Sequence, residues 1–403
     1  MPADSDNDSD VNIVVTQPRR VAATALAQRV AREMKSPPPG QPDSLVGHHV
    51  QLDRAVWDDT ARIVYCTVGI LVRRLVFAMG GHTEYTHIVI DEVHERDVQT
   101  DFLLALIRGT VLPRNPNLRI VIMSATASAD LFVDYFDPYK PKVLTIPGRT
   151  FPVETKWITD CQQMLKKEVK HYHDTTTPAT TNNGTVQSSG TSSANVTLSP
   201  RAMDPIDNVF IEHLIAYIIR RQQANGEDHL RTSNSKQRNN GGAILVFLPG
   251  KGEIEALFRI LTTKHSVLTQ IRKEDCKIDI HRLYSGVSWQ VQQAVFEPAG
   301  AKSIKVILST NVAETSITIP DVSHVIDTGL VKESRFNAER RIHELVTVWT
   351  SQASTLQRSG RAGRTMAGVC YRLYSQRLWQ ECMLPYTPPE MIRTPLDDLI
   401  IQL

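Results

Sequence analysis

The sequence predicts an α/β protein with two domains, each built on a mainly parallel sheet. Short β-branched runs alternate with segments of helical periodicity, as in successive β–α–β units. The same rhythm occurs on both sides of a polar gap at residues 175–200. The 403 residues also suffice for two to three domains of roughly 150 residues each.

In the first block, strands and helices are expected to alternate along residues 11–124. The expected strands are Val11–Thr16, Arg62–Cys66, His87–Ile90 and Leu118–Ser124. The expected helices are Ala22–Met34, Val68–Met79 and Thr100–Thr110. Crossover helices of this kind cover the faces of a parallel sheet.

The second block repeats this alternation. Apolar residues recur at helical spacing from Val209 to Ile219, after the candidate cap Asp204-Pro205. The polar stretch from Arg221 to Gly242 predicts a long loop. The expected strands are Ala243–Leu248, Lys277–Leu283, Ile304–Ser309 and His324–Ile326, and the expected helices are Glu253–Leu261 and Ser288–Phe296.

Composition narrows the class of protein. Hydrophobic residues make up 41% and charged residues 22%, which are ordinary values for a globular protein. No run of about 18 apolar residues occurs, so a transmembrane helix is not expected. The acidic opening MPADSDNDSD has neither signal-peptide nor transit-peptide character. The five cysteines form no CxxC pair, which favours free thiols in a reducing compartment. We therefore expect an intracellular protein, cytoplasmic or nuclear, with no membrane partner.

A cluster of carboxylates follows the apolar strand in the segment His87-Ile-Val-Ile-Asp-Glu-Val-His-Glu-Arg-Asp97. Ligands of parallel α/β sheets bind beyond the carboxyl ends of the strands. Asp91 is suited to Mg²⁺, which prefers hard oxygen ligands, and Glu92 to an attacking water. His94 is placed to connect this site to a neighbouring element. The alternative interpretation is a solvated strand end with acidic caps.

Arginines and glycines alternate in Gln357-Arg-Ser-Gly-Arg-Ala-Gly-Arg364. Glycine lets the backbone approach a ligand closely, and guanidinium groups match phosphate oxygens. This pattern favours a site for phosphoryl groups, with a solvated basic turn as the alternative.

Hydroxyl and amide side chains gather after a strand in Ser309-Thr-Asn-Val-Ala-Glu-Thr-Ser-Ile-Thr-Ile319. They suit contacts to phosphate and sugar, although an ordinary helix N-cap is an alternative. Ser124-Ala-Thr126 and Thr16-Gln-Pro-Arg-Arg20 are weaker signals on their own.

Together, these segments resemble the motifs of superfamily 2 helicases of the DEAH/RHA class. TQPRRVAATALAQRVA resembles motif Ia, TVGILVRR motif Ib, DEVH motif II, SAT motif III, ILVFLPG motif IV, STNVAETSITIPDV motif V and QRSGRAGR motif VI. Their order and spacing match the family over residues 11–376. The resemblance implies two RecA-like domains that use ATP, or another NTP, with Mg²⁺. It also implies RNA rather than DNA as the partner, and leaves an activating protein partner open.

The resemblance implies a role for each matching residue. The residues implied in hydrolysis are Asp91, Glu92, His94, Gln357, Arg361 and Arg364, with the carboxylates at Mg²⁺ and water and the arginines at the β/γ-phosphates. Ser124 and Thr126 would couple hydrolysis to domain movement, and Arg29 and Phe296 would sandwich the base. Backbone contacts to RNA would come from Arg19, Arg20, Thr67, Arg73, Thr310, Asn311 and Thr315. The segment Val331–Glu344 matches a strand-separating hairpin.

The family's phosphate loop, GxxGxGK[ST], does not occur in the 403 residues. The nearest match, Pro249-Gly-Lys-Gly252, lacks the following Ser or Thr and is interpreted as an ordinary loop. The loop's amides and lysine cradle phosphates. We therefore expect a helicase core truncated at both ends, without its P-loop strand and inactive as given. The alternative is a catalytically dead module that binds RNA or protein.

The expected domain map has five parts. They are an acidic disordered tail at 1–10, a partial RecA-like domain at 11–158, a low-complexity linker at 159–203, a second RecA-like domain at 204–376, and the start of a winged-helix domain at 377–403. The tract at 175–200 is expected to be a spacer, with a regulatory role as the alternative.

Overall fold

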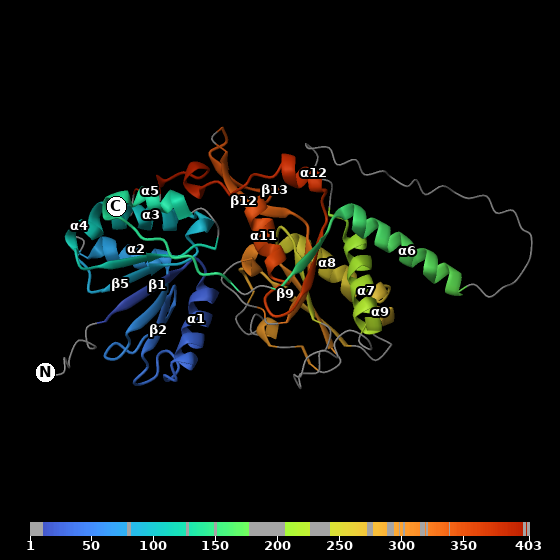
Figure 1. Cartoon of the computed structure of the whole chain (residues 1–403), viewed down its shortest axis with the longest axis horizontal. Coiled ribbons are helices and arrows are strands. Elements are labelled where there is room, and N and C mark those ends of the chain that lie inside the picture. The colour runs from blue at the N-terminus through green and yellow to red at the C-terminus, as the bar shows by residue number, and fades with distance from the viewer. Residues whose placement is uncertain are drawn as a thin grey trace, which may run out of the picture.

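The chain forms two α/β domains that lie side by side (Figure 1). The computed structural model describes residues 11–78, 82–125, 129–148, 151–176, 206–225, 242–271, 277–287, 294–297, 299–300, 303–314, 319, 321–337, 339–397 and 400. Each domain is built on a six-stranded, mainly parallel sheet. The predicted fold class is therefore confirmed.

The first sheet has the strand order β3-β2-β4-β1-β5-β6. Its strands are β1 (Ile13–Gln17), β2 (Val46–Val50), β3 (Asp53–Ala55), β4 (Ile63–Thr67), β5 (His87–Ile90) and β6 (Arg119–Ile122). The four predicted strands are confirmed, whereas β2 and β3 were missed. The sequence of β2, Val-Gly-His-His-Val, interrupts the β-branched run that identifies the others.

Helices of the first domain pack against this sheet. They are α1 (Arg20–Glu33), α2 (Val68–Phe77), α3 (Val98–Leu106), which continues into a π-helical turn (Ile107–Val111), α4 (Leu112–Arg114) and α5 (Ala129–Tyr135), with 3₁₀ turns at Val93–Glu95 and Asp137–Tyr139. Leu71 of α2 and Leu103 of α3 pack with Ile88 and Ile90 of β5 in one buried cluster. The three predicted helices of this block are confirmed.

Strand β6 is the outer strand at one edge of the first sheet. Among the described strands, it pairs with β5 alone. Val121 and Met123 are 42% and 38% exposed. This edge therefore has unpaired backbone groups and uncovered apolar side chains, as expected for a sheet without the P-loop strand.

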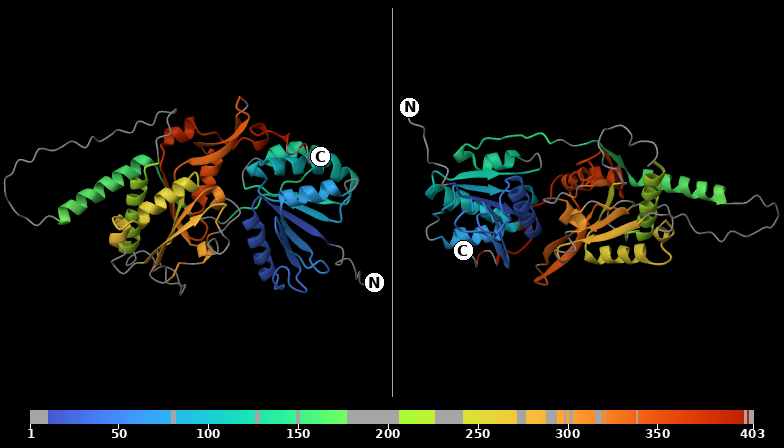
Figure 2. Two further views of the ribbon diagram at one scale, coloured as in Figure 1. Left: turned by 180° about the vertical axis from the view of Figure 1, so that it is seen from behind. Right: turned by 90° about the horizontal axis from the view of Figure 1, so that it is seen from below.

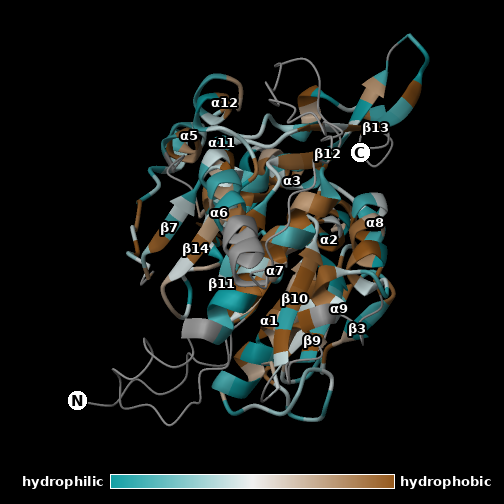
Figure 3. Ribbon diagram, turned by 90° about the vertical axis from the view of Figure 1, so that its right-hand side faces the viewer, coloured by the Kyte–Doolittle hydropathy of each residue, from teal (hydrophilic) through white to brown (hydrophobic). Residues whose placement is uncertain are grey.

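The second sheet has the order β7-β14-β11-β8-β10-β9, and all its pairings are parallel. Its strands are β7 (Val153–Lys156), β8 (Ala243–Phe247), β9 (Lys277–Leu283), β10 (Ser303–Ser309), β11 (Val322–Asp327) and β14 (Gly368–Arg372). Every residue of β8 and β10 is buried. The hydropathy colouring shows β10 as a largely apolar strand (Figure 3). The four strands predicted for this block are confirmed.

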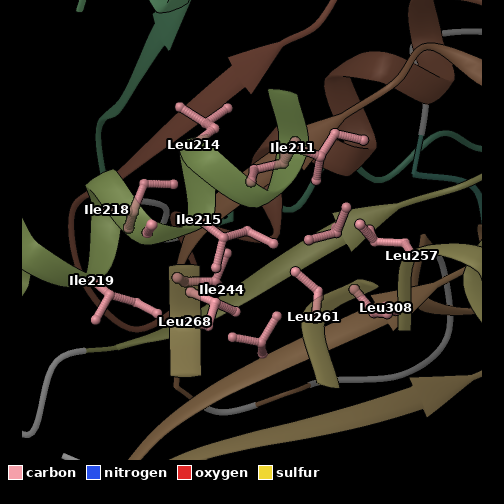
Figure 4. Close-up of a cluster of buried hydrophobic side chains, with 14 of the residues drawn as sticks. Ile211, Leu214, Ile215, Ile218, Ile219, Ile244, Leu257, Leu261, Leu268 and Leu308 are labelled. Atoms are coloured by element: carbon pink, nitrogen blue, oxygen red, sulfur yellow. The ribbon is translucent and has the colours of Figure 1, made fainter. Parts of the chain in front are cut away.

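Among the described helices, α6 (Ile158–Thr176), α7 (Asn208–Asn225), α8 (Lys251–Thr262) and α9 (Val267–Ile271) accompany this sheet. Ile211, Leu214 and Ile218 of α7 point into the core beside Ile244 and Leu308 (Figure 4). Their spacing is the predicted helical stripe, which is therefore confirmed.

The boundary between the domains was predicted too late in the chain. Strand β7 joins the second sheet beside β14, so the chain leaves the first domain before Val153 rather than at residue 158. The linker predicted from residue 159 is also wrong in its first part, because 158–176 form α6. Cys161 on α6 is buried in the core of the second domain, so the start of α6 packs on that domain.

Two further loop predictions need correction. Residues 221–225 are the last turn of α7, although a loop was predicted there. The segment Pro249-Gly-Lys-Gly252, the nearest match to the phosphate loop, was interpreted as a loop. Its last two residues, Lys251 and Gly252, are the first residues of α8. The predicted features at 1–10, 177–200, Asp204-Pro205, 226–241 and 288–293 lie outside the described residues.

A two-stranded hairpin, β12 (Leu330–Asn337) with β13 (Ile342–Trp349), projects from the second domain (Figures 1 and 2). It confirms the hairpin expected at Val331–Glu344. Helix α11 (Gln352–Gly360) follows, and α12 (Gln376–Glu381) and a 3₁₀ turn (Glu390–Ile392) lie near the C-terminus. Within the described part of the chain, every helix is too short or too polar to traverse a lipid bilayer.

Candidate functional site

Parallel register brings the predicted site residues of the first domain to one edge of its sheet. Gln17 at the end of β1 lies opposite Thr67 at the end of β4. Thr16 lies opposite Ile90, so Asp91 follows at the same edge. The polar residues after these strands therefore converge, as ligand sites in such sheets do.

The Asp91 carboxylate is held by two donors. Its Oδ2 accepts a hydrogen bond of 2.6 Å from Nε2 of Gln17, and its Oδ1 accepts one of 2.9 Å from the backbone N–H of Glu92. Gln17 is fully buried, and its Oε1 has no hydrogen-bond partner in the structure. Gln17 therefore orients Asp91, a role that sequence reasoning missed.

The loop after Asp91 contains two residues in the left-handed region of backbone conformation. Glu92 has φ 57° and Arg96 has φ 52°, on either side of the 3₁₀ turn Val93–Glu95. Such conformations cost roughly 1–3 kcal/mol each for residues other than glycine and concentrate at functional sites. Asp97 then caps α3 by accepting from the N–H of Thr100 at 3.0 Å, and burial raises the pKa of its carboxyl.

His94 joins three segments of the site. Its Nε2 lies 3.4 Å from Oε2 of Glu92 and 2.8 Å from the side-chain amide of Gln357, which belongs to the second domain. Its Nδ1 accepts from the N–H of Ala125 at 3.3 Å. The 2.8 Å contact is between Nε2 of His94 and the side-chain amide nitrogen of Gln357. His94 thus connects the carboxylate loop, the segment after β6 and helix α11.

Arg358, the first arginine of the glycine-rich segment, is part of the core of the second domain. It is 1% exposed and donates to Glu314 at 3.0 Å, to Asp327 at 2.9 Å and to the carbonyl of Leu330 at 3.3 Å. Burial lowers the pKa of Arg358, but the two carboxylates outweigh burial and raise it. Arg358 therefore supports the segment from inside and is not available to a ligand.

Arg361 and Arg364 lie at the boundary between the domains. Burial and the charge of Arg364 lower the pKa of Arg361 to about 9, although Glu314 and Glu92 act in the opposite direction. Burial also lowers the pKa of Arg364, against the charge of Glu92. Two partly desolvated cations that repel each other are suited to a polyanion, whose charge relieves the repulsion.

The remaining residues predicted for nucleotide contact are less closely gathered. Arg29 on α1 is largely exposed and pairs with Glu33 at 2.8 Å. Phe296 is half-buried against the core of the second domain, which Val21 of α1 also contacts. Ser124 is exposed at the end of β6, and Thr126 lies outside the described residues.

Residues predicted for nucleic-acid contact come from both domains. Arg19 pairs with Glu95 at 3.4 Å, and with Asn311 it lines a cavity of about 600 Å³ that also reaches His94 and Gln357. Thr310 accepts from the N–H of Val312 at 3.5 Å as a cap. Thr67 is the N-cap of α2, Arg20 and Arg73 are exposed on α1 and α2, and Thr315 lies outside the described residues.

The residues present fit a magnesium ion that is held mainly by the phosphates of a bound nucleotide and by water. Asp91 offers two hard carboxylate oxygens at the sheet edge. Each oxygen accepts one of the two hydrogen bonds described above. Among the described residues, no group of three or more His, Cys, Asp or Glu side chains could hold a metal ion by itself. Mg²⁺ is typically bound in this way, through one or two carboxylates plus phosphate oxygens and water.

Comparisons with known proteins agree with this geometry. Residues 227–366 match the helicase conserved C-terminal domain. The chain is 38% identical to a protein of Mycosarcoma maydis provisionally named a DEAH-box ATP-dependent helicase, over 98% of this chain and 25% of that protein. It is 34% identical to the human ATP-dependent RNA helicase DHX29, over 98% of this chain and 29% of the relative. The crystal structure of the Escherichia coli DEAH/RHA helicase HrpB superposes with a TM-score of 0.70 at 26% identity, covering 98% of this chain and 40% of HrpB.

Over nearly its whole length, the chain is similar to helicases of the DEAH/RHA class. It spans between a quarter and two fifths of the length of the curated relatives that it matches. In helicase terms, motif II contributes Asp91, Glu92 and His94, motif III contributes Ala125, and motif VI contributes Gln357. The structure therefore brings three helicase motifs into direct contact.

Sequence reasoning missed the side chains that support these helicase motifs. Glu314 and Asp327 hold Arg358, Glu314 also accepts from Ser354, and its carbonyl accepts from Arg361. Glu314 lies within the quoted motif V, so the motif itself was a signal. Asp327 is the last residue of β11 and lies in none of the motifs, so the sequence gave no signal for it.

Proposed function

We propose that this chain is the two-domain core of an RNA helicase, in which ATP, or another NTP, is hydrolysed at the boundary between the domains. The contact between His94 and Gln357 carries the proposal, because it joins the carboxylates of one domain to the arginine segment of the other. Nucleotide bound at this boundary would touch both domains, so its hydrolysis would change their separation.

The described side chains support a division of labour at the proposed site. Asp91 would hold Mg²⁺, which when bound neutralises charge on the phosphates. Glu92 would orient or deprotonate the attacking water, with Gln357 positioning it. Arg361, which is buried, and Arg364 would stabilise charge on the β/γ-phosphates.

RNA is proposed to lie across both domains, on Arg19, Asn311 and the exposed arginines of α1 and α2. This assignment follows the RNA helicase names of the relatives. DNA is the less favoured partner. We also propose an intracellular location for the protein. Contacts to the backbone rather than to base edges predict sequence-independent, salt-sensitive binding.

The first experiment measures RNA-stimulated ATP hydrolysis by the 403-residue chain with Mg²⁺. The 403 residues contain no GxxGxGK[ST] sequence, and hence no lysine and amides of that kind for the β/γ-phosphates. We therefore expect RNA binding without turnover. Turnover that Glu92→Gln abolishes would overturn the expected inactivity and support the assigned site at once.

A binding module without catalysis is the second candidate, favoured by the missing phosphate loop. Both candidate functions require binding of nucleic acid. Fluorescence anisotropy with single-stranded RNA and DNA of one sequence tests this binding. Arg73→Gln should weaken RNA binding and reduce the slope against salt by about 0.7. Arg377→Gln, at an exposed ion pair on α12, is the matched control and should change neither. Binding that is insensitive to salt and to Arg73→Gln would contradict the proposed RNA path.

A further inference from the structure

Residues 384–397, here called the strap, cross from the second domain to the first. The strap leaves α12, passes the base of the hairpin β12–β13 and ends against the first domain (Figure 1). Part of it, Tyr386–Glu390, forms one wall of the cavity that reaches His94 and Gln357. The strap therefore touches the boundary between the domains at the proposed hydrolysis site.

At its first-domain end, the strap holds the residues that follow the carboxylate loop. The N–H of Glu390 donates to the carbonyl of Arg96 at 2.9 Å, and Oε2 of Glu390 accepts from the N–H of Val98 at 3.1 Å. Met391 packs against the core of the first domain. Glu390 thus satisfies a free N–H in the first turn of α3, where a negative charge is also favoured by the helix dipole.

At the opposite end of the boundary, the strap caps a helix of the second domain. The carbonyls of Leu384 and Pro385 accept from the N–H groups of Gln352 and Ala353 at 2.8 and 3.1 Å. These are the first residues of α11, whose later turns carry Gln357 and Arg358. One short segment therefore supplies oxygen atoms to the open N-terminal turns of a helix in each domain.

A third contact ties the strap to the hairpin. The N–H of Phe336 donates to the carbonyl of Arg393 at 3.2 Å, and Nη1 of Arg393 lies 3.5 Å from the carbonyl of Ser334. The Arg393 guanidinium also pairs with Glu333 at 3.7 Å, and both side chains are mostly buried. Only two residues separate Arg393 from Glu390, so the hairpin and α3 share one short anchor.

We propose that the strap couples the carboxylate loop to the hairpin, with Glu390 and Arg393 as positioning residues. A displacement of α3 relative to α11 has to move the strap or break its hydrogen bonds, because the strap binds both helix ends. Movement of the strap shifts Arg393 and, through it, β12. The role of this coupling in unwinding rests on the function proposed above, whereas the coupling itself does not.

Hydrogen–deuterium exchange on the 403-residue chain tests the coupling without nucleotide or RNA. Glu390→Ala removes the acceptor for the N–H of Val98. We expect exchange to rise about fivefold at residues 96–100, the effect of losing one ordinary hydrogen bond, and to rise measurably at Phe336 and Gln352 as well. Arg393→Ala should produce the reciprocal change, with faster exchange at Phe336 and also at Val98.

Two controls separate coupling from general loosening. Glu390→Gln keeps an acceptor oxygen and should restore most of the protection at all three sites. Arg377→Gln on α12 should leave exchange unchanged throughout. Faster exchange confined to each variant's own contact would overturn the proposal, because the strap would then be two independent anchors. Since no catalysis is measured, inactivity in ATP hydrolysis would not affect this outcome.

Discussion

The two sheets of this chain differ in how far they are covered. In the second domain, the central strands β8 and β10 are buried along their whole length, and helices α7 and α8 cover them. In the first domain, β6 lies at the sheet edge with Val121 and Met123 exposed. The second domain therefore has the more complete core, and we expect it to be the more stable unit.

An ion pair of the second domain is also more deeply buried than the ion pair compared with it in the first domain. Arg358 of the second domain is enclosed with Asp327, and both side chains are at most 1% exposed. The ion pair of Arg96 with Asp101 in the first domain is partly open, at 26% and 9% exposed. Burial makes the ion pair of Arg358 with Asp327 costly to break, whereas water can replace part of the ion pair of Arg96 with Asp101.

The largest effect is expected from breaking the buried network. Arg358→Met leaves the carboxylates of Asp327 and Glu314 without their cation and should lower the free energy of unfolding by about 4 kcal/mol. Arg96→Met in the first domain should cost about 1 kcal/mol or less. Urea unfolding followed by circular dichroism measures both, and equal losses would remove the proposed contrast.

Truncation of apolar side chains sharpens the comparison of the sheets. Leu308→Ala, at a fully buried position of β10, should cost about 3 kcal/mol in the unfolding of the second domain. Val121→Ala on β6 should change the unfolding free energy by about 0.5 kcal/mol or less, since that side chain is already solvated. A larger loss at Val121 than at Leu308 would show that an unseen contact covers β6.

Acid should weaken the second domain through His324. Burial lowers the pKa of His324 to about 4, where its ring stacks on Tyr371 and accepts from Gln222. The unfolded chain takes up this proton near pH 6.5, so stability is complete above pH 6.5 and falls as the pH drops toward 4. At pH 5 the loss should be about 2 kcal/mol.

The variant His324→Gln removes the titrating group and should flatten stability between pH 6.5 and 4, measured by urea unfolding at each pH. His343→Gln, at an exposed position of the hairpin, serves as the matched control. An unchanged pH profile in His324→Gln would assign the acid sensitivity to other groups.

The smallest effect concerns the link between the domains. A double-mutant cycle of His94→Ala and Gln357→Ala should give a coupling energy of about 1 kcal/mol, because one hydrogen bond of 2.8 Å joins them. Thermal unfolding of the four proteins supplies the cycle. Additive losses would mean that the two side chains do not act across the boundary.

Much of the fold could be predicted from local pattern. The β-branched strands and the apolar stripe of α7 were found because side-chain periodicity follows directly from strand and helix geometry. Strand β2 was missed because its histidines and glycine hide the pattern, although Val46 and Val50 are buried. Helix α6 was missed because its polar residues outnumber the few that pack on the core, among them Cys161.

The site was predictable in its parts but not in its contacts. The motifs identified Asp91, His94 and Gln357 as candidates because their residue types suit phosphate chemistry. They could not show that Gln17 holds Asp91, nor that Arg358 is enclosed while Arg361 and Arg364 remain at the boundary. Nothing in the order of residues distinguishes an arginine enclosed by two carboxylates from its neighbours in the same segment.

By itself, the sequence determined the α/β class, the strand ends at which polar residues gather and the resemblance to helicases. Tertiary structure decided which of these residues meet. The bond from Gln17 to Asp91 spans 74 positions, the one from His94 to Gln357 spans 263 and the one from Val98 to Glu390 spans 292. Periodicity acts over a few residues, whereas contacts over such distances exist only after both sheets have formed and packed.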